Sequence, residues 1–321
     1  MGRAVSSKQD HSDESVHLKS PMEWWQLSGV LREEGGDRKF GLEYVFFHAY
    51  SKEDSSHAFQ SHIALIDPKK QLYLNDYQSV VIPDSVAVIN DRRPLNLKVK
   101  KGSETWKLKG EAGWFSLGAT MSDHPGYGFR LSTEAIRKKH LYSFPSSEVL
   151  QGVHYFSYPS LHVSGILHLQ EEKVKVEGEL WYDRIWNASI LVRKEVRWNW
   201  LSIRLNKQNK LLIFSVSTEK NAQREIYGTF FPDTGIAMEI EPDKIQMTET
   251  SWWVSSVSKK KYADGWKINI PVLELEVQVD AVVPQQEFRA HLLSYWAGLC
   301  DVKGRFGGED VLGNAYVEIK K

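Results

Sequence analysis

The clearest pattern along the chain is the alternation of apolar and polar residues with a period of two. Between Lys173 and Trp181, the apolar residues Val174, Val176 and Leu180 alternate with charged ones. Successive side chains of a strand point to opposite faces, so this alternation predicts a half-buried antiparallel strand. Comparable runs cover residues 24–31, 40–47, 59–66, 95–99, 161–169, 198–205, 211–216, 272–279 and 315–319.

Turn signals separate these runs, and no long segment has the helical period. They include Glu-Gly-Gly-Asp at 34–37, Asp-His-Pro-Gly at 123–126 and Asp-Gly at 264–265. Many short strands at regular spacing predict a sandwich or a barrel, and closure of a sheet removes its exposed edges. The length of 321 residues suits two domains. We therefore predict an all-β fold of two antiparallel β-barrel or β-sandwich domains in tandem.

The polar start of the chain and a Trp-rich strand set the predicted domain limits. Residues 1–20 are polar and charged, so we expect them to be disordered. The N-terminal domain is predicted to cover residues 21–195. The run Arg197-Trp198-Asn199-Trp200 opens the predicted C-terminal domain, residues 196–321.

The charge balance and the cysteine count exclude several classes of function. Lys plus Arg total 41, as do Asp plus Glu, so no overall field favours nucleic acid. The single Cys300 excludes an intrachain disulfide and thiolate zinc clusters. No apolar run reaches about 18 residues, so no membrane-spanning helix is expected. The first twenty residues lack the apolar stretch of a signal peptide, and we expect a cytoplasmic or already processed protein.

Aromatic residues are abundant, with 12 Trp, 13 Tyr and 13 Phe. Their side chains suit strands and also the walls of apolar pockets. The expected partner is thus a hydrophobic small molecule such as a polyene, polyketide or isoprenoid, although a large β core would need the same residues. The sequence leaves the oligomeric state open.

Two aromatic clusters contain candidate acids. Glu23-Trp24-Trp25 opens the first predicted strand, and its two Trp residues point to opposite faces, so that one can face a cavity. The second cluster, residues 181–186, encloses Asp183 and Arg184 between aromatic residues. Burial would raise the pKa of Asp183 and make it a proton donor, whereas pairing with Arg184 would lower that pKa. For both clusters, a purely structural role in packing or ion pairing is the alternative.

No metal or cofactor is predicted. His162 and His168 share a strand face but lie about 20 Å apart, too far to bind one ion. His48, His62 and His154 could converge only through the fold. The chain has no GxSxG elbow, glycine-rich phosphate loop or Cys/His nucleophile pattern, so nucleotide cofactor chemistry is not expected.

The ordered series of motifs resembles the carotenoid 1,2-hydratase (CrtC) and AttH-like lipocalin family, whose relatives include lipocalin-like Diels–Alderases. The family's EWWY, FF, YYS, WxDxxW, YWEG and terminal GxxYVEL patterns are similar to segments of this chain in the same order. Those segments are Glu23–Gln26, Phe46–Phe47, Tyr155–Ser157, Trp181–Trp186, Tyr295–Gly298 and Gly313–Ile319. The resemblance spans residues 21–321 and implies two lipocalin-like domains with a pocket within or between them.

Three departures from the family pattern bear on the reaction. Gln26 stands where the family has tyrosine, and Ile185 and Ala297 stand where it has acids. Hydration of an alkene needs an acid, aromatic faces for the cation and a base for water. Cyclisation of a polyene depends mainly on positioning and tolerates the loss of acids. We therefore predict a cofactor-independent, Diels–Alderase-like cyclase of natural-product biosynthesis, with a hydratase or a non-catalytic carrier as alternatives.

The predicted site combines both clusters with residues of the resemblance. The candidate catalytic residues are Glu23, His62, Tyr155 and Asp183. The candidate substrate-binding residues are Trp24, Trp25, Gln26, Phe47, His48, Trp181, Trp186, Tyr295 and Trp296.

Overall fold

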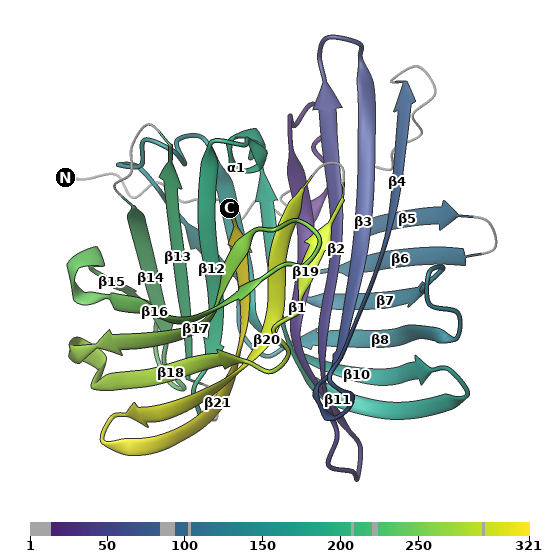
Figure 1. Ribbon diagram of the computed structural model, residues 1–321. Coiled ribbons are helices and arrows are strands. Elements are labelled where there is room, and N and C mark those ends of the chain that lie inside the picture. The colour runs from purple at the N-terminus through teal and green to yellow at the C-terminus, as the bar shows by residue number, and fades with distance from the viewer. Residues whose placement is uncertain (1–13, 84–93, 102–103, 207–208, 220–223, 291–292) are drawn as a thin grey trace.

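The computed structural model describes residues 14–83, 94–101, 104–206, 209–219, 224–290 and 293–321. These residues form two antiparallel sheets, joined by the single-turn helix α1 (Ser189–Val192) (Figure 1). The first sheet ends at Trp186 and the second begins at Val196. The prediction of an all-β fold with two barrel-like antiparallel sheets is confirmed.

The first sheet is a half-barrel with the strand order β4-β3-β2-β1-β11-β10-β8-β7-β6-β5, and β9 pairs with β10. Its strands are β1 (Glu23–Glu33), β2 (Lys39–Ser51), β3 (Ser56–Asp67), β4 (Leu72–Pro83), β5 (Leu95–Lys101), β6 (Glu104–Glu111), β7 (Trp114–Thr120), β8 (Tyr127–Ala135), β9 (His140–Tyr142), β10 (His154–Leu169) and β11 (Glu172–Trp186). A 3-10 turn at Pro68–Lys70 connects β3 to β4.

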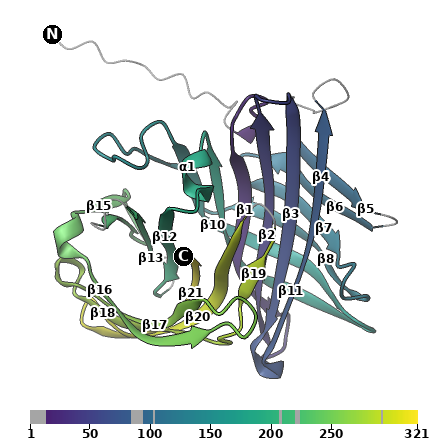
Figure 2. The ribbon, with the colours of Figure 1, turned by 45° about the horizontal axis from the view of Figure 1, so that its top comes forward.

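The second sheet curves into a nearly closed barrel with the order β15-β14-β13-β12-β21-β20-β18-β17-β16, and β19 pairs with β20 (Figure 2). Its strands are β12 (Val196–Arg204), β13 (Lys210–Thr218), β14 (Glu225–Phe231), β15 (Met238–Ile240), β16 (Gln246–Val254), β17 (Lys261–Ile270), β18 (Leu275–Ala281), β19 (Glu287–Arg289), β20 (Ser294–Phe306) and β21 (Glu309–Lys320). The 3-10 turns Pro242–Lys244 and Pro271–Leu273 precede β16 and β18.

Three apolar cores hold the molecule together. One fills the half-barrel and another fills the barrel. The third lies where β1, β2 and β11 of the first sheet face β12, β13, β20 and β21 of the second. In β1, Trp25 and Leu27 point into the half-barrel while Trp24 and Val30 point toward the other sheet. Strands covered on both faces become apolar nearly throughout, and this explains why β1 is buried from Glu23 to Leu31.

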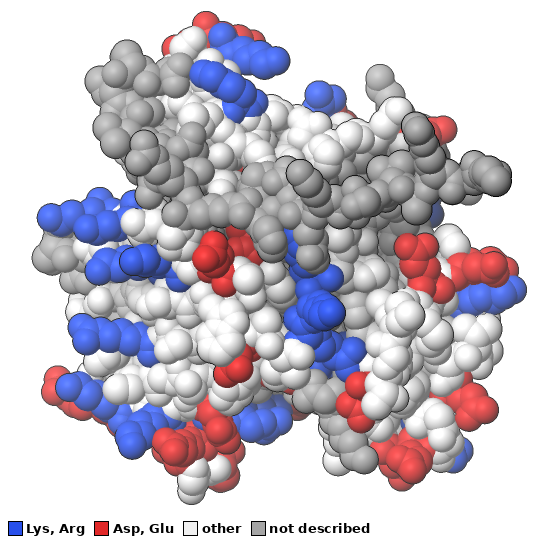
Figure 3. Space-filling model, turned by 180° about the vertical axis from the view of Figure 1, so that it is seen from behind, with Lys and Arg blue, Asp and Glu red and all other residues white. Residues whose placement is uncertain are grey.

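The outer face of the half-barrel follows the predicted alternation. On β5, β6 and β8 the exposed positions carry Lys98, Lys107, Lys109 and Arg130, between buried apolar residues. Figure 3 shows rows of basic side chains over this part of the molecule, with acidic side chains spread elsewhere on the same face. On β5, which ends the strand order of this sheet, Lys98 discourages pairing with another chain.

Two local predictions were wrong. Asp264-Gly265 was predicted as a turn but lies within β17, opposite an irregularity of β16 at Ser251. The Asp264 carboxylate accepts a hydrogen bond of 2.6 Å from the Ser251 hydroxyl. The irregularity at Ser251 is a β-bulge, which bends β16 locally so that the Asp-Gly pair stays within β17. The strand predicted at 272–279 begins only at Leu275, because Pro271 starts a 3-10 turn that ends with Glu274 in the left-handed region, φ 48°.

The expectation of disorder over residues 1–20 does not hold for residues 14–20; residues 1–13 lie outside the described part. Val16 packs into the half-barrel core, and the buried Glu14 carboxylate accepts hydrogen bonds from the Ala112 amide (2.9 Å) and the Tyr158 hydroxyl (3.0 Å). The Trp25 indole donates to the Glu14 carbonyl at 2.9 Å. These contacts attach the polar segment to the aromatic interior.

Candidate functional site

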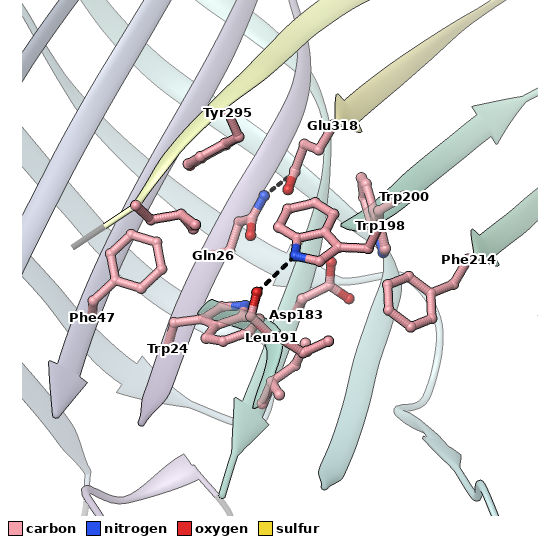
Figure 4. A pocket seen from close by; sticks show the side chains of 12 residues that line it. Trp24, Gln26, Phe47, Asp183, Leu191, Trp198, Trp200, Phe214, Tyr295 and Glu318 are labelled. Atoms are coloured by element: carbon pink, nitrogen blue, oxygen red, sulfur yellow. Dashed lines mark hydrogen bonds between the residues drawn. The ribbon is translucent and has the colours of Figure 1, made fainter. Parts of the chain in front are cut away.

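An aromatic cleft lies between the facing surfaces of the two sheets. Side chains from β1, β2, β11, β12, β13, β20 and β21 enclose it, together with α1 (Figure 4). Its lining consists of Trp24, Gln26, Phe47, Asp183, Ile185, Leu191, Trp198, Trp200, Phe214, Leu293, Tyr295 and Glu318. Below, this set is called the inter-sheet cleft.

Strand register places the polar groups of the cleft among its aromatic rings. Gln26 on β1 is paired directly with Asp183 on β11, and Trp24 is paired with Ile185. Because side chains alternate along a strand, these four residues face the second sheet together. Trp198 and Trp200 have the same spacing of two on β12 and reach the cleft from the opposite side.

Asp183 is buried in this apolar surrounding. Its Oδ1 accepts hydrogen bonds from the Tyr155 hydroxyl (2.7 Å) and the Trp181 indole (2.8 Å). The Trp200 indole donates to the same Tyr155 hydroxyl at 3.0 Å. Burial raises the pKa of Asp183 to about 7, although both hydrogen bonds favour the charged form. Since both bonds use Oδ1, Oδ2 is the oxygen that would carry a proton into the cleft.

The neighbouring Arg184 does not pair with Asp183, because consecutive strand residues face opposite ways. Its guanidinium lies inside the half-barrel over the Trp25 ring, 4.0 Å from the ring centroid, and pairs with the buried Glu23 carboxylate. Burial would raise the pKa of Glu23, but the charge of Arg184 and hydrogen bonds from His17 and His48 outweigh it and lower that pKa to about 2. Glu23 is therefore a buried anion and Asp183 is the available proton donor.

A second polar cluster borders the cleft. The Gln26 amide donates to the carboxylates of Glu318 on β21 and of Glu43 on β2. The Tyr295 hydroxyl lies 3.1 Å from Glu43 Oε1 and 2.8 Å from His62 Nε2. Figure 4 shows Gln26 extending toward Glu318, with Asp183 beside the Trp198 ring.

Glu318 is the second buried acid of the site. Burial raises its pKa well above the ordinary value of 4.5, and the negative charges of Glu43 and Asp183 raise it further. Like charges close together in a low-dielectric site disfavour one another's ionisation. Ionisation of Glu318 is therefore disfavoured, and a carboxyl group that keeps its proton can donate a hydrogen bond as well as accept one.

The cleft is narrow. Its volume, measured as the space open to the centre of a water molecule, is about 30 Å³, which is room for water but not for a drug-sized ligand. A larger ligand fits only when some of the lining side chains move apart. The large apolar ligand expected from the sequence therefore requires a wider conformation of the cleft.

The structure brings together part of the predicted site. Trp24, Gln26, Phe47, Asp183 and Tyr295 line the cleft, and His62, Tyr155 and Trp181 lie behind it in hydrogen-bond contact with lining residues. The remaining predicted residues lie elsewhere. Glu23, Trp25, His48 and Trp186 belong to the half-barrel side, around Arg184 or next to it, and Trp296 packs inside the barrel with its indole donating to the Pro284 carbonyl.

Several site residues were not predicted, although signals for them exist. Glu43 is the one charged residue within the apolar run at 40–47, and Glu318 lies on the opposite face of β21 from Val317 and Ile319. Trp198 and Trp200 were recognised as the start of a domain, and their spacing of two indicates a shared face. A charged residue inside a buried strand is an informative signal of a functional site.

Within the described part of the chain, no group of three or more His, Cys, Asp or Glu residues is arranged to hold a metal ion. No helix among these residues is long and apolar enough to span a membrane.

The fold defines the protein as an all-β protein in which a half-barrel and a nearly closed barrel face each other across an aromatic and carboxyl-lined cleft. The AttH-like family matches residues 7–320, and the chain belongs to this family. A comparison of the sequence with curated proteins gives no match.

Solved structures share the fold over nearly the whole chain. A putative AttH from Nitrosomonas europaea is 19% identical, with a TM-score of 0.80, and the match covers 100% of this chain and 99% of that one. Kievitone hydratase from Nectria haematococca is 15% identical, with a TM-score of 0.68, covering 96% and 91%. CghA with Sch210972 is 13% identical, with a TM-score of 0.57, covering 94% and 88%.

Proposed function

We propose that this protein is an enzyme that adds water to, or removes it from, a carbon–carbon double bond of an apolar substrate. The reaction takes place in the inter-sheet cleft. The observation that carries the proposal is the pair of buried acids, Asp183 and Glu318, whose pKa values burial raises inside an aromatic enclosure. That one structural relative is named a hydratase supports the reaction class.

Protonation of the double bond by Asp183 is the first step. The proton on Oδ2 moves to one alkene carbon, and the other carbon becomes cationic, so the substrate must be an alkene that forms a tertiary, allylic or benzylic cation. The rings of Trp24, Trp198 and Trp200 face the cleft and stabilise this cation through their π-electrons. Desolvation of the cleft strengthens these interactions.

Addition of water completes the cycle. After the first step Asp183 is a carboxylate, which takes a proton from a water molecule as its oxygen bonds to the cationic carbon. Asp183 thereby returns to its neutral form, and no other proton source is consumed. Glu318 and Gln26, which are hydrogen-bonded to each other in the cleft wall, hold the water. Because one carboxyl group both donates and accepts the proton, hydrogen and hydroxyl add to the same face of the double bond.

The buried acids distinguish this reaction from the alternatives. Cyclisation by positioning does not require a group that changes its protonation state, and a carrier protein gains nothing from one. The pKa of Asp183 is about 7 in the folded protein instead of the ordinary 3.8. Above pH 7, where the group is ionised, this difference lowers the free energy of unfolding by about 4 kcal/mol. A strongly raised pKa in a cleft marks a candidate acid–base residue. The cyclase prediction made from the sequence is therefore the weaker proposal.

The test is turnover of a panel of apolar alkenes in water labelled with heavy oxygen, followed by mass spectrometry. The panel contains aryl alkenes, isoprenoid alcohols and acyclic carotenoids. Hydration yields a product heavier by one labelled water, and dehydration of the corresponding alcohols yields one lighter by a water. A product of unchanged mass means cyclisation, and a substrate bound but returned intact means carriage; either result overturns the proposal.

Two variants assign the reaction to the cleft. Asp183→Asn keeps the shape of the side chain and the acceptor for Tyr155 and Trp181 but removes the acid. It is expected to lower turnover by about 10²-fold or more, the usual contribution of a general acid. The matched control is Asp310→Asn, which is expected to leave turnover unchanged because this side chain, near the start of β21, is 95% exposed.

A further inference from the structure

A second cavity lies at the open end of the C-terminal barrel, where β12 begins and β21 ends. It is lined by side chains of β12, β13 and β21. Glu219 after β13, Arg224 before β14 and Lys321 after β21 complete the lining. Its volume, measured as the space open to the centre of a water molecule, is about 460 Å³. This is within the range of small-molecule sites. The cavity is called the barrel mouth below.

Cross-strand pairs build the barrel mouth in layers. Leu201 on β12 pairs with Ile213 on β13, and both belong to the apolar core that closes the barrel below. The next pair on the same face is Asn199 with Ser215, and the pair after that is Arg197 with Ser217. The interior surface therefore changes from apolar to neutral polar to charged toward the opening. Binding sites in ordinary lipocalin-type barrels are apolar, so this gradient points to a different ligand.

The polar layer contains donors that are buried rather than solvated. Ser215 is only 1% exposed and Asn199 only 5%, and both line the cavity. Within the described residues, the buried Ser215 hydroxyl has no hydrogen-bond partner. An unpaired hydroxyl in this position costs free energy, which a ligand oxygen would recover.

Positive charge dominates the rim. The lining contains the four basic residues Arg197, Arg224, Lys320 and Lys321 and a single acid, Glu219, a net of three positive charges. Arg197 and Glu219 lie 3.5 Å apart, Lys321 lies 4.0 Å from Glu249, and Lys320 donates to the Arg193 carbonyl at 2.5 Å. The excess of cations above a buried hydroxyl and amide attracts an anion that also accepts hydrogen bonds.

We propose that the barrel mouth is a binding site for a small polar oxyanion, a molecule bearing a phosphate or several carboxylates. The oxyanion accepts hydrogen bonds from the Ser215 hydroxyl and the Asn199 amide and pairs with the basic rim. The pairs Asn199–Ser215 and Arg197–Ser217 lie on the opposite face of β12 from Trp200, whereas Trp198 borders both the barrel mouth and the inter-sheet cleft. Binding of an anion at the barrel mouth is measured without turnover, so its failure and the failure of the proposed hydration are distinguishable.

Calorimetric titration of the full chain with inorganic pyrophosphate and, separately, with citrate tests the proposal. Both are expected to bind with one site per chain at low salt, and affinity is expected to fall as salt rises. Tighter binding of pyrophosphate identifies a phosphate-bearing ligand, and tighter binding of citrate identifies a polycarboxylate. Absence of binding by both probes overturns the proposal.

Variants locate the binding. Ser215→Ala removes only the buried hydroxyl and Arg224→Gln removes one rim charge; each is expected to weaken binding about tenfold, as for loss of a hydrogen bond to a charged group. The control Arg305→Gln makes the same charge change at the opposite end of the barrel and is expected to leave affinity unchanged. Equal weakening by Arg305→Gln, or no effect of Ser215→Ala, would mean nonspecific charge attraction instead of a built site.

Discussion

Replacement of Asp183 by Asn tests the central physical claim, that an acid is kept neutral inside the inter-sheet cleft. The pKa of this carboxyl rises from its ordinary 3.8 to about 7 because it is buried. In the native state it binds a proton that the unfolded state releases between these two values, so the free energy of unfolding falls as pH rises through this window. Each pKa unit corresponds to about 1.4 kcal/mol, which makes the total about 4 kcal/mol.

The asparagine variant lacks this dependence. Near pH 4 the neutral acid and the amide are nearly equivalent, so wild type and Asp183→Asn are expected to unfold with similar free energies. Near pH 8 the variant is expected to be more stable by up to about 4 kcal/mol, since it has no charge to bury. Urea unfolding at a series of pH values measures the difference between the two proteins.

Neighbouring acids contribute to the same titration. Asp183 is one of the charges that raise the pKa of Glu318, so its removal also eases ionisation of Glu318. The double variant Asp183→Asn/Glu318→Gln separates the two contributions. A stability difference between wild type and Asp183→Asn that stays constant from about pH 4 to about pH 8 would refute the reasoning, because it would mean that Asp183 is ionised throughout.

Three further predictions concern contacts within and between the two sheets. Tyr155→Phe removes a hydrogen bond that favours the charged form of Asp183, so the alkaline limit of the pH–rate profile should move to higher pH. Arg184→Met removes the cation that pairs with the buried Glu23 carboxylate. Urea unfolding should therefore show that the free energy of unfolding falls by about 3–5 kcal/mol. Gly178→Ala places Cβ only 2.1 Å from a backbone oxygen of β1, which should cost about 1–3 kcal/mol in the same assay.

Each of these three variants has a result or a control that would contradict the prediction. A pH–rate limit that stays in place or moves to lower pH in Tyr155→Phe would contradict the assignment of Asp183 as the titrating acid. A loss below about 1 kcal/mol in Arg184→Met would show that water or the two neighbouring histidines compensate Glu23. Gly118→Ala is the control for Gly178→Ala, because the nearest atom to its Cβ, the Phe129 oxygen, is 3.7 Å away.

The period-two pattern of the sequence determined most of the strands and, within each, which residues share a face. It placed Trp24 and Trp25 on opposite faces of the first strand, because alternation of side chains is a property of every strand. Asp264-Gly265 shows the limit of this reasoning, since a turn-forming pair is tolerated inside a strand when a bulge on the neighbouring strand accommodates it. The order of the motifs along the chain also indicated the family, because that order is a property of the sequence alone.

Only the tertiary structure decided which of the two candidate acids, Glu23 or Asp183, faces the inter-sheet cleft. Asp183 and Arg184 are adjacent in sequence, yet the packing of a sheet on both faces of β11 puts one in the cleft and the other in the half-barrel beside Glu23. Gln26 and Glu318 are 292 residues apart and meet because the two sheets pack against each other. The proton affinity of a carboxyl group depends on burial and on nearby charges, which come from both sheets and are set by the packing between them.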